Sequence, residues 1–235
     1  MWKPRASKLY ARRVLRTAKR NLLNLAFHRE THAKETPWAY RSFNEQEEFL
    51  SRVTRRITGK KGLGLSFASF CEQQARSGKS LRILEDGPGN GDLLVGLKRE
   101  LNARRIKTET IGISLVRNPQ LLSRVTNHEI DRVHWGIAER YVPRKPVDII
   151  LSIFGSLCHT FEEVKKDHLL KFAYSLRPGG GIMVISSGFS QQHAFRQNLR
   201  SAFEKRGFKA QFVPVGKTLC SGSETLVIQR LVTKH

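Results

Sequence analysis

The stretch ILEDGPGNGDLL, residues 83–94, decides the fold class of this chain of 235 residues. An apolar run stops at two adjacent acids, Glu85 and Asp86, and three glycines follow at alternate positions. A glycine-rich turn after a strand is typical of a ligand site, because glycine permits a tight bend and close approach of a ligand to the backbone. Two carboxylates directly before the turn would repel a phosphate, so they argue against a phosphate-binding turn.

A turn that binds a dinucleotide needs the pattern Gly-x-Gly-x-x-Gly or Ala. Counted from Gly87, the last position of that pattern is Asp92, which suits neither close helix packing nor a pyrophosphate. A ligand with cationic groups fits better, since an acid at the end of a strand attracts positive charge. The stretch therefore favours a cationic cofactor over a dinucleotide.

From residue 81 onward, apolar strands alternate with amphipathic helices. This alternation predicts an α/β fold with a mainly parallel sheet and helices on both faces. The last two strands have no helix between them, so they are expected to form an antiparallel hairpin. The expected strands are 81–84, 109–115, 132–138, 147–154, 180–187, 209–216 and 224–232, and the expected helices are 92–105, 118–125, 161–176 and 190–207.

ILEDGPGNG resembles the first motif of class I (Rossmann-like) S-adenosylmethionine-dependent methyltransferases, an apolar strand followed by acid-x-Gly-x-Gly-x-Gly. Other segments resemble the family's later motifs in order: TIGISLVRNPQLL, GIAERYVP, VDIILSIFGSLCH and LRPGGGIMVIS. The match covers roughly residues 81–232. The resemblance implies a seven-stranded Rossmann-like methyltransferase fold with S-adenosyl-L-methionine as the cofactor.

The resemblance also implies which residues bind the cofactor. Glu85 would help to hold its amino-acid end, whereas Asp86 is interpreted as incidental or as a local turn contact. The family usually ends its second strand with an acid that holds the ribose hydroxyls. Ser114 stands at that place. A serine can still hydrogen-bond a hydroxyl, but without the charge of a carboxylate. The predicted cofactor-binding residues are Glu85, Gly87, Gly89, Asn90, Gly91, Ser114, Ala138, Glu139 and Ser152, with Ala138 and Glu139 near the adenine.

The segment SIFGSLCHT, residues 152–160, is expected to face the transferred methyl group. It lacks the Asn/Asp-Pro-Pro-Tyr motif of the methyltransferases that act on exocyclic base nitrogens. It also lacks the Pro-Cys pair of the methyltransferases that attack C5 of cytosine, so Cys158 is interpreted as structural. His159 is a candidate base for a hydroxyl or nitrogen acceptor, or else it lines the cleft or caps the next helix. Alignment of donor and acceptor supplies much of the rate of such a transfer, so an obvious base is not required.

The chain is strongly basic, with 42 Lys and Arg against 20 acids and a net charge of +22. Such an excess is typical of proteins with a polyanionic partner, most simply nucleic acid and RNA in particular, and less often an anionic membrane surface. An unusually basic surface without such a partner is the alternative. Residues 1–80 hold 18 of the basic residues and 6 of the acids, so the first third carries more than half of the excess.

Residues 7–27 have a helical period and contain no Asp or Glu. Three interpretations stay open: a basic helix on RNA or DNA phosphates, an Arg-rich organellar targeting segment, or the solvated face of a helix packed on the main domain. The expected apolar face holds Leu15, Ala18, Leu22, Leu25 and Ala26, and Arg12, Arg13, Arg16, Lys19 and Arg20 lie mostly off it.

Residues 1–78 are interpreted as a basic, mainly helical extension, and residues 79–235 as the cofactor-binding domain. Within the extension, a helix capped by Ser42 or Asn44 is expected to end near residue 58, and a second one covers about 65–76. The three cysteines are far apart, which predicts a reducing compartment and no structural zinc. No apolar run approaches the roughly 18 residues of a membrane span, and no secretory signal is visible. An intracellular protein is expected, cytoplasmic first, or in the mitochondrial matrix if the Arg-rich start is a targeting segment.

The leading hypothesis is an S-adenosylmethionine-dependent methyltransferase that acts on nucleic acid, with RNA, including ribosomal RNA, as the expected acceptor. One alternative is a methyltransferase-like RNA-binding or assembly protein without turnover, which Ser114 motivates. Another is a methyltransferase for a small molecule or a protein, in which the charge serves localisation.

Overall fold

The computed structural model describes residues 42–58, 66–75, 80–153, 162–186, 193–214 and 224–231, together with a few residues between 11 and 19. From residue 81 to residue 230, strands and helices follow one another in the predicted order. The segment that contains Cys158 and His159 lies outside the described residues.

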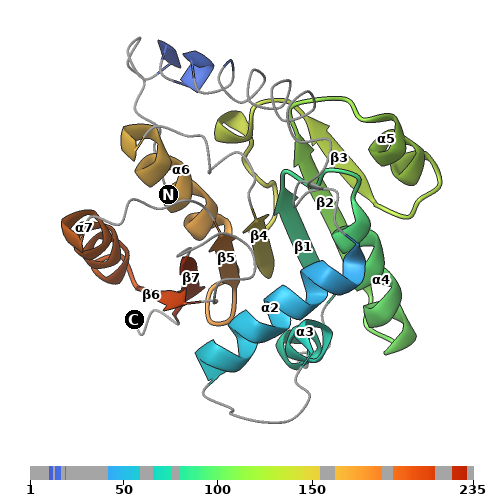
Figure 1. Ribbon diagram of the computed structural model, residues 1–235, viewed down its shortest axis with the longest axis horizontal. Coiled ribbons are helices and arrows are strands. Elements are labelled where there is room, and N and C mark those ends of the chain that lie inside the picture. Colours follow the sequence, from blue (N-terminus) through green and yellow to red (C-terminus); the bar gives the residue numbers. More distant parts are fainter. Residues whose placement is uncertain are drawn as a thin grey trace.

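Seven strands form one sheet in the order β3-β2-β1-β4-β5-β7-β6 (Figure 1). Strands β1 to β5 run parallel, and β7 is antiparallel to both β5 and β6, so the predicted fold class and the C-terminal hairpin are confirmed. The strand order reverses at β1, and such a switch point leaves a crevice at the carboxyl ends of the strands. The strands are β1 (Leu81–Asp86), β2 (Thr108–Ser114), β3 (Arg132–Trp135), β4 (Ile149–Ile153), β5 (Ile182–Ser186), β6 (Phe208–Pro214) and β7 (Glu224–Arg230).

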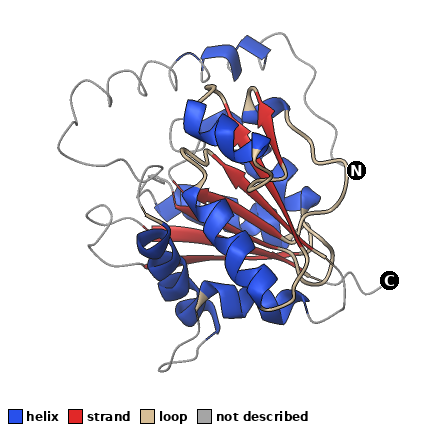
Figure 2. Ribbon diagram, turned by 90° about the vertical axis from the view of Figure 1, so that its right-hand side faces the viewer, coloured by secondary structure: helices blue, strands red, loops and turns tan. Residues whose placement is uncertain are grey.

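Helices cover both faces of the sheet, and Figure 2 shows the strands between them. Alternation along each strand divides the core: Ile83 belongs to the cluster under α2, α3, α4 and α5, whereas Leu84 belongs to the cluster under α6 and α7. The helices are α2 (Phe43–Thr58), α3 (Phe67–Ala75), α4 (Asp92–Ala103), α5 (Pro119–Thr126), α6 (Glu162–Ser175) and α7 (His193–Glu204), with a 3-10 turn, η2 (Ala138–Arg140), after β3.

The first described helices pack on the sheet. Ser42, and not Asn44, caps α2: its backbone N–H donates to Glu45 Oε2 at 3.0 Å, and the N–H of Glu45 donates to Ser42 Oγ at 3.5 Å. Residues of α2 and α3 lie in the same apolar cluster as β1 and β4. Phe43 lies so close to α4 that a β-carbon on Gly96 would be 2.1 Å from its ring. Helices α2 and α3, which belong to the predicted extension, therefore share the core of the sheet.

The few described residues near the N-terminus are helical. Val14 is 3% exposed and Leu15 is 51% exposed. The prediction that Leu15 belongs to the packed face is therefore wrong, and Val14 takes its place. Arg12, Arg16 and Lys19 are exposed, as predicted for the basic side of this helix. None of the helices in the described residues is both long enough and apolar enough to span a membrane.

Candidate functional site

The glycine turn lies where β1 ends, in the centre of the sheet (Figure 1). The N–H of Gly87 donates to the carbonyl of Ile113 at 3.0 Å and continues the pairing with β2. The chain then turns sharply, and the N–H of Gly91 donates to the carbonyl of Pro88 at 2.7 Å. Gly87, Gly89 and Gly91 have φ values of 80°, 54° and 81°, in the left-handed region that favours glycine.

Gly91 also has no room for a side chain. A β-carbon there would lie 2.5 Å from Cδ1 of Ile130 and 2.9 Å from Cδ1 of Leu121. The third glycine of the motif therefore lets the start of α4 lie directly against α5 and the loop that follows it. This contact supports the turn from the side of α5.

The two acids before the turn point to opposite faces of the sheet, because successive side chains of a strand alternate. Glu85 is buried on the α4 side, and its Oε2 has no hydrogen-bond partner among the described residues. Burial, and after it the nearby carboxylates of Asp86 and Asp92, raise the pKa of Glu85 to about 8. A buried carboxyl without a partner is costly, so this group is suited to receive a cationic ligand.

Asp86 is buried on the α6 side of the sheet. The hydroxyl of Ser152, at the end of β4, donates to its Oδ2 at 2.9 Å. The interpretation of Asp86 as incidental or as a local turn contact is therefore wrong, because its partner lies on another strand. Ser152 is fully buried and its hydroxyl is directed to Asp86, and its role in cofactor binding stays a prediction.

Asn118 is a site residue that the sequence did not single out. Its Oδ1 accepts from the N–H of Gln120 and so caps α5. Its Nδ2 donates to Oδ1 of Asn90 at 2.8 Å and to the carbonyl of Gly89 at 3.4 Å. One side chain thus joins the turn after β2 to the turn after β1. The Asn-Pro pair signals a helix start, but no local pattern reveals the second contact.

The end of β2 carries Ser114, which is partly exposed. Its hydroxyl donates to the carbonyl of Val116 at 2.7 Å. The proton of this hydroxyl is thereby engaged, and its lone pairs still accept a hydrogen bond. Ser114 can therefore accept a hydrogen bond from a ribose hydroxyl, without the charge of a carboxylate.

The turn after β3 places Ala138 and Glu139 in η2, where both are buried. The ends of β1, β2 and β3 are neighbours in the sheet, so the predicted residues of these three turns lie along one edge. The individual cofactor contacts of all nine predicted residues stay predictions. His159 lies outside the described residues, and within the described ranges no group of three His, Cys, Asp or Glu could hold a metal ion.

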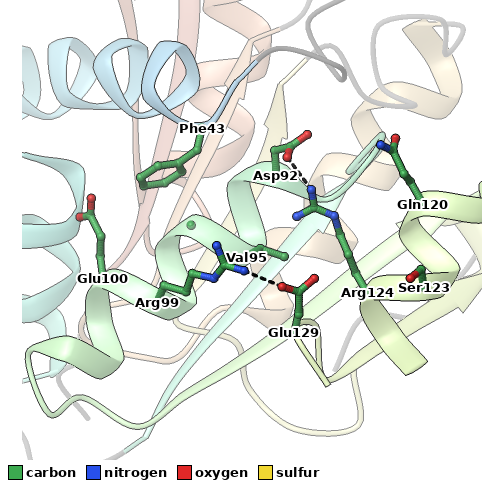
Figure 3. A pocket seen from close by; sticks show the side chains of 10 residues that line it. Phe43, Asp92, Val95, Arg99, Glu100, Gln120, Ser123, Arg124 and Glu129 are labelled. Atoms are coloured by element: carbon green, nitrogen blue, oxygen red, sulfur yellow. Dashed lines mark hydrogen bonds and ion pairs between the residues drawn. The ribbon is translucent and has the colours of Figure 1, made fainter. Parts of the chain in front are cut away.

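A groove of about 500 Å³ lies between α4 and α5 (Figure 3). Arg99 pairs there with Glu129 at 2.5 Å. Arg124 pairs with Asp92 at 2.6 Å, directly behind the glycine turn. Because both guanidinium groups are paired with carboxylates, this groove does not suit a polyanion.

Neither a family model nor a curated protein matches the sequence. Solved structures do match. A class I S-adenosylmethionine-dependent methyltransferase from Listeria monocytogenes matches with a TM-score of 0.58 at 12% identity, over 92% of this chain and 68% of that one. A sugar N-methyltransferase from Streptoalloteichus matches with a TM-score of 0.55 at 13% identity, over 88% of this chain and 92% of that one. The chain has the fold of the class I methyltransferases.

A third matching structure contains a bound ligand. The 1,6-didemethyltoxoflavin-N1-methyltransferase of Burkholderia thailandensis, with bound S-adenosylhomocysteine, matches with a TM-score of 0.52 at 16% identity, over 97% of this chain and 91% of that one. The predicted resemblance is thus confirmed for the fold. At identities of 12–16% the likeness says nothing about which substrate this chain uses.

Proposed function

We propose that this protein is an S-adenosyl-L-methionine-dependent methyltransferase. The observation that carries the proposal is Glu85, a buried carboxyl with an unpartnered oxygen beside the glycine turn of a class I methyltransferase fold. The amino-acid end of this cofactor carries an ammonium group, which would pair with a carboxylate in that position. The residues present therefore fit the cofactor.

Each turn of the site would bind a different part of the cofactor. The glycine turn would receive the amino-acid end of the cofactor, with Glu85 beside it. Ser114 would accept from a ribose hydroxyl, and Ala138 and Glu139 would lie at the adenine. When bound, the cofactor supplies a methyl group on a sulfonium, which is already a good leaving centre. The contribution of the chain is then mainly to align the acceptor with that methyl group.

Nucleic acid, and RNA in particular, is the proposed acceptor. The net charge of +22 supports this, because basic residues release counterions from phosphates on binding. Arg12, Arg16 and Lys19 are exposed and belong to the segment with the highest basic excess. Arg144 and Lys145, in the loop before β4, are also exposed. His159 stays a candidate base.

A protein that binds RNA without turnover is the second candidate. Ser114 favours it, since the hydroxyl proton is engaged by Val116 and no charge is available for the ribose. This candidate predicts salt-sensitive RNA binding with weak cofactor binding or none. A small-molecule or protein acceptor would leave cofactor binding intact and remove the need for RNA.

Calorimetric titration with S-adenosylhomocysteine tests the proposal. Wild-type protein should bind, and Gly89→Arg should abolish binding by filling the turn. Gly180→Arg is the matched control, because Gly180 is exposed in the turn before β5, at the opposite edge of the sheet. The absence of any heat of binding for the wild type at millimolar ligand would contradict the enzyme.

A further inference from the structure

Helix α6 buries three basic or titratable side chains. Lys165, His168 and Lys171 are 5%, 1% and 3% exposed. They recur at every third residue, so they share the face of the helix that packs on the sheet with Leu169 and Phe172. Lysine is almost never fully buried unless it is paired, so the surroundings of these side chains need an explanation.

Lys171 contacts the turn after β3 and faces the end of β1. Its Nζ donates to the carbonyl of Ala138, in η2, at 2.8 Å. The carboxylates of Glu139, in η2, and Asp86, at the end of β1, both act on its charge. Asp86 is held in turn by the hydroxyl of Ser152, at the end of β4. The ammonium group of Lys171 thus contacts η2 after β3 and faces Asp86 at the end of β1, and Ser152 of β4 is linked to it through Asp86.

Opposing effects set the pKa of Lys171. Burial lowers the pKa of Lys171 to about 8, while Glu139 and Asp86 oppose that fall. Two imidazoles also face it: burial and the charge of Lys171 lower the pKa of His134, at β3, and of His168, on α6. The group therefore carries its charge at neutral pH and loses it in mildly alkaline solution.

The cofactor cleft of this fold is formed by the turns at the carboxyl ends of the strands. Its shape depends on how far the turn after β3 stands from the turn after β1. Lys171 donates a hydrogen bond to Ala138 in the turn after β3 and faces Asp86, which precedes the glycine turn after β1. Removing one partner of a buried charge pair leaves the others uncompensated, so these segments would shift.

We propose that Lys171 is a positioning residue that holds the Ala138–Glu139 turn in register with the glycine turn, so that cofactor affinity depends on its charge. This inference rests on the proposed function, because it presumes that the cleft binds S-adenosyl-L-methionine. Lys171 does not touch the transferred group. It acts through the backbone of Ala138 and the carboxylate of Asp86.

Calorimetry with S-adenosylhomocysteine compares Lys171→Met with Lys166→Met. Lys166 lies on the same helix and is exposed, so the control removes an equal charge without touching the cleft. Lys171→Met should weaken binding by about ten-fold or more, and Lys166→Met should leave it unchanged. Lys171→Arg, which keeps the charge, should recover part of the loss. A Lys171→Met protein that melts at a lower temperature but binds like the wild type would overturn the proposal.

The pH profile of binding provides a second test, which does not need Lys171→Met to fold. Glu85 and Lys171 both titrate near pH 8, so the profile is measured in a Glu85→Gln background. The amino group of the ligand also loses its proton in this range, so the reference is the Glu85→Gln, Lys171→Arg double variant, whose guanidinium group keeps its charge. Affinity of Glu85→Gln should fall more steeply than that of the double variant as pH rises through about 8, since Lys171 becomes neutral. Equal profiles of the two proteins between pH 6.5 and 9.5 would overturn the role of Lys171. Wild-type protein that does not bind at all would instead contradict the proposed function.

Discussion

The side-chain amide of Asn118 donates a hydrogen bond to Oδ1 of Asn90 at 2.8 Å, and so joins α5 to the glycine turn. The same side chain caps α5 through its other atom, which accepts from Gln120. These two functions can be separated by substitution. Asp keeps the accepting oxygen of the cap and removes the donor toward Asn90.

Asn118→Asp should therefore keep the stability of the protein and lose cofactor affinity. The carboxylate would face Oδ1 of Asn90 and the carbonyl of Gly89, both acceptors, and so would push the turn out of place. Asn118→Ala should lose affinity and, in addition, about 1 kcal/mol of unfolding free energy through the lost cap. The measurements are chemical denaturation and titration with S-adenosylhomocysteine. Wild-type affinity in Asn118→Asp would show that the contact does not shape the site.

Glu85→Gln should stabilise the protein without ligand. The pKa of Glu85 is raised from 4.5 to about 8, so the folded protein holds a proton that the unfolded chain releases between these values. The free energy of unfolding therefore falls as pH rises through this window. Gln removes that penalty, and the gain should reach about 1 kcal/mol or more at pH 7.5. Denaturation at pH 5 to 8 measures it, with the exposed Glu48→Gln as the control.

The same titration predicts a proton release on ligand binding. An ammonium group beside Glu85 favours its carboxylate form, so S-adenosylhomocysteine should displace a proton at pH 7. Calorimetry in buffers of different ionisation enthalpy measures the released proton. Glu85→Gln should bind more weakly and release none from this position. An unchanged affinity in Glu85→Gln would mean that the carboxyl does not meet the ligand.

The order of strands and helices could be predicted because each element is encoded locally. The apolar runs, the glycine spacing at residues 87–91 and the capping box of Ser42 depend on neighbours within a few residues. The polar contacts of the site could not be predicted in this way. Asp86 meets Ser152 and Asn118 meets Asn90 only because the sheet brings distant segments together.

The burial of polar side chains on helix α6 could not be predicted from the sequence either. Lysine and histidine letters in a helix usually indicate a solvated face, yet Lys165, His168 and Lys171 are buried. For Lys171, the carboxylates of Asp86 and Glu139 oppose the cost of burial, and the sequence does not place them beside it. The expectation for Leu15 failed for a similar reason, since helical periodicity gives two adjacent faces and packing decides between them.

Gly96→Ala should destabilise the protein, although alanine is normally the better helix former. A β-carbon at this position would lie 2.1 Å from Cδ2 of Phe43, so the Phe43 ring would have to move out of its contact with α4. We expect a loss of about 1–3 kcal/mol in the free energy of unfolding. Gly180→Ala is the control, because the nearest atom there is Gln74 Oε1 at 3.5 Å. Increased stability of Gly96→Ala would contradict the packing of α2 on α4.

The N-terminal basic residues should contribute to RNA affinity. Replacing Arg12, Arg16 and Lys19 together by Gln should reduce the slope of log affinity against log salt by about 2, the value for three contacts with a single strand. Filter binding of a single-stranded RNA between 50 and 200 mM salt measures this slope. Replacing Lys107, Lys205 and Lys209, which are also exposed, removes the same charge elsewhere. An equal effect of both triple variants would show that only net charge matters.

The most direct test of the central claim is methyl transfer. Purified protein is incubated with S-adenosyl-L-methionine labelled in its methyl group and with an extract, which is then separated into RNA, protein and metabolites. The account predicts label in the RNA fraction with wild-type protein and with Gly180→Arg, and none with Gly89→Arg. Label in the protein or metabolite fraction alone would contradict the acceptor, and no label in any fraction would contradict methyl transfer itself.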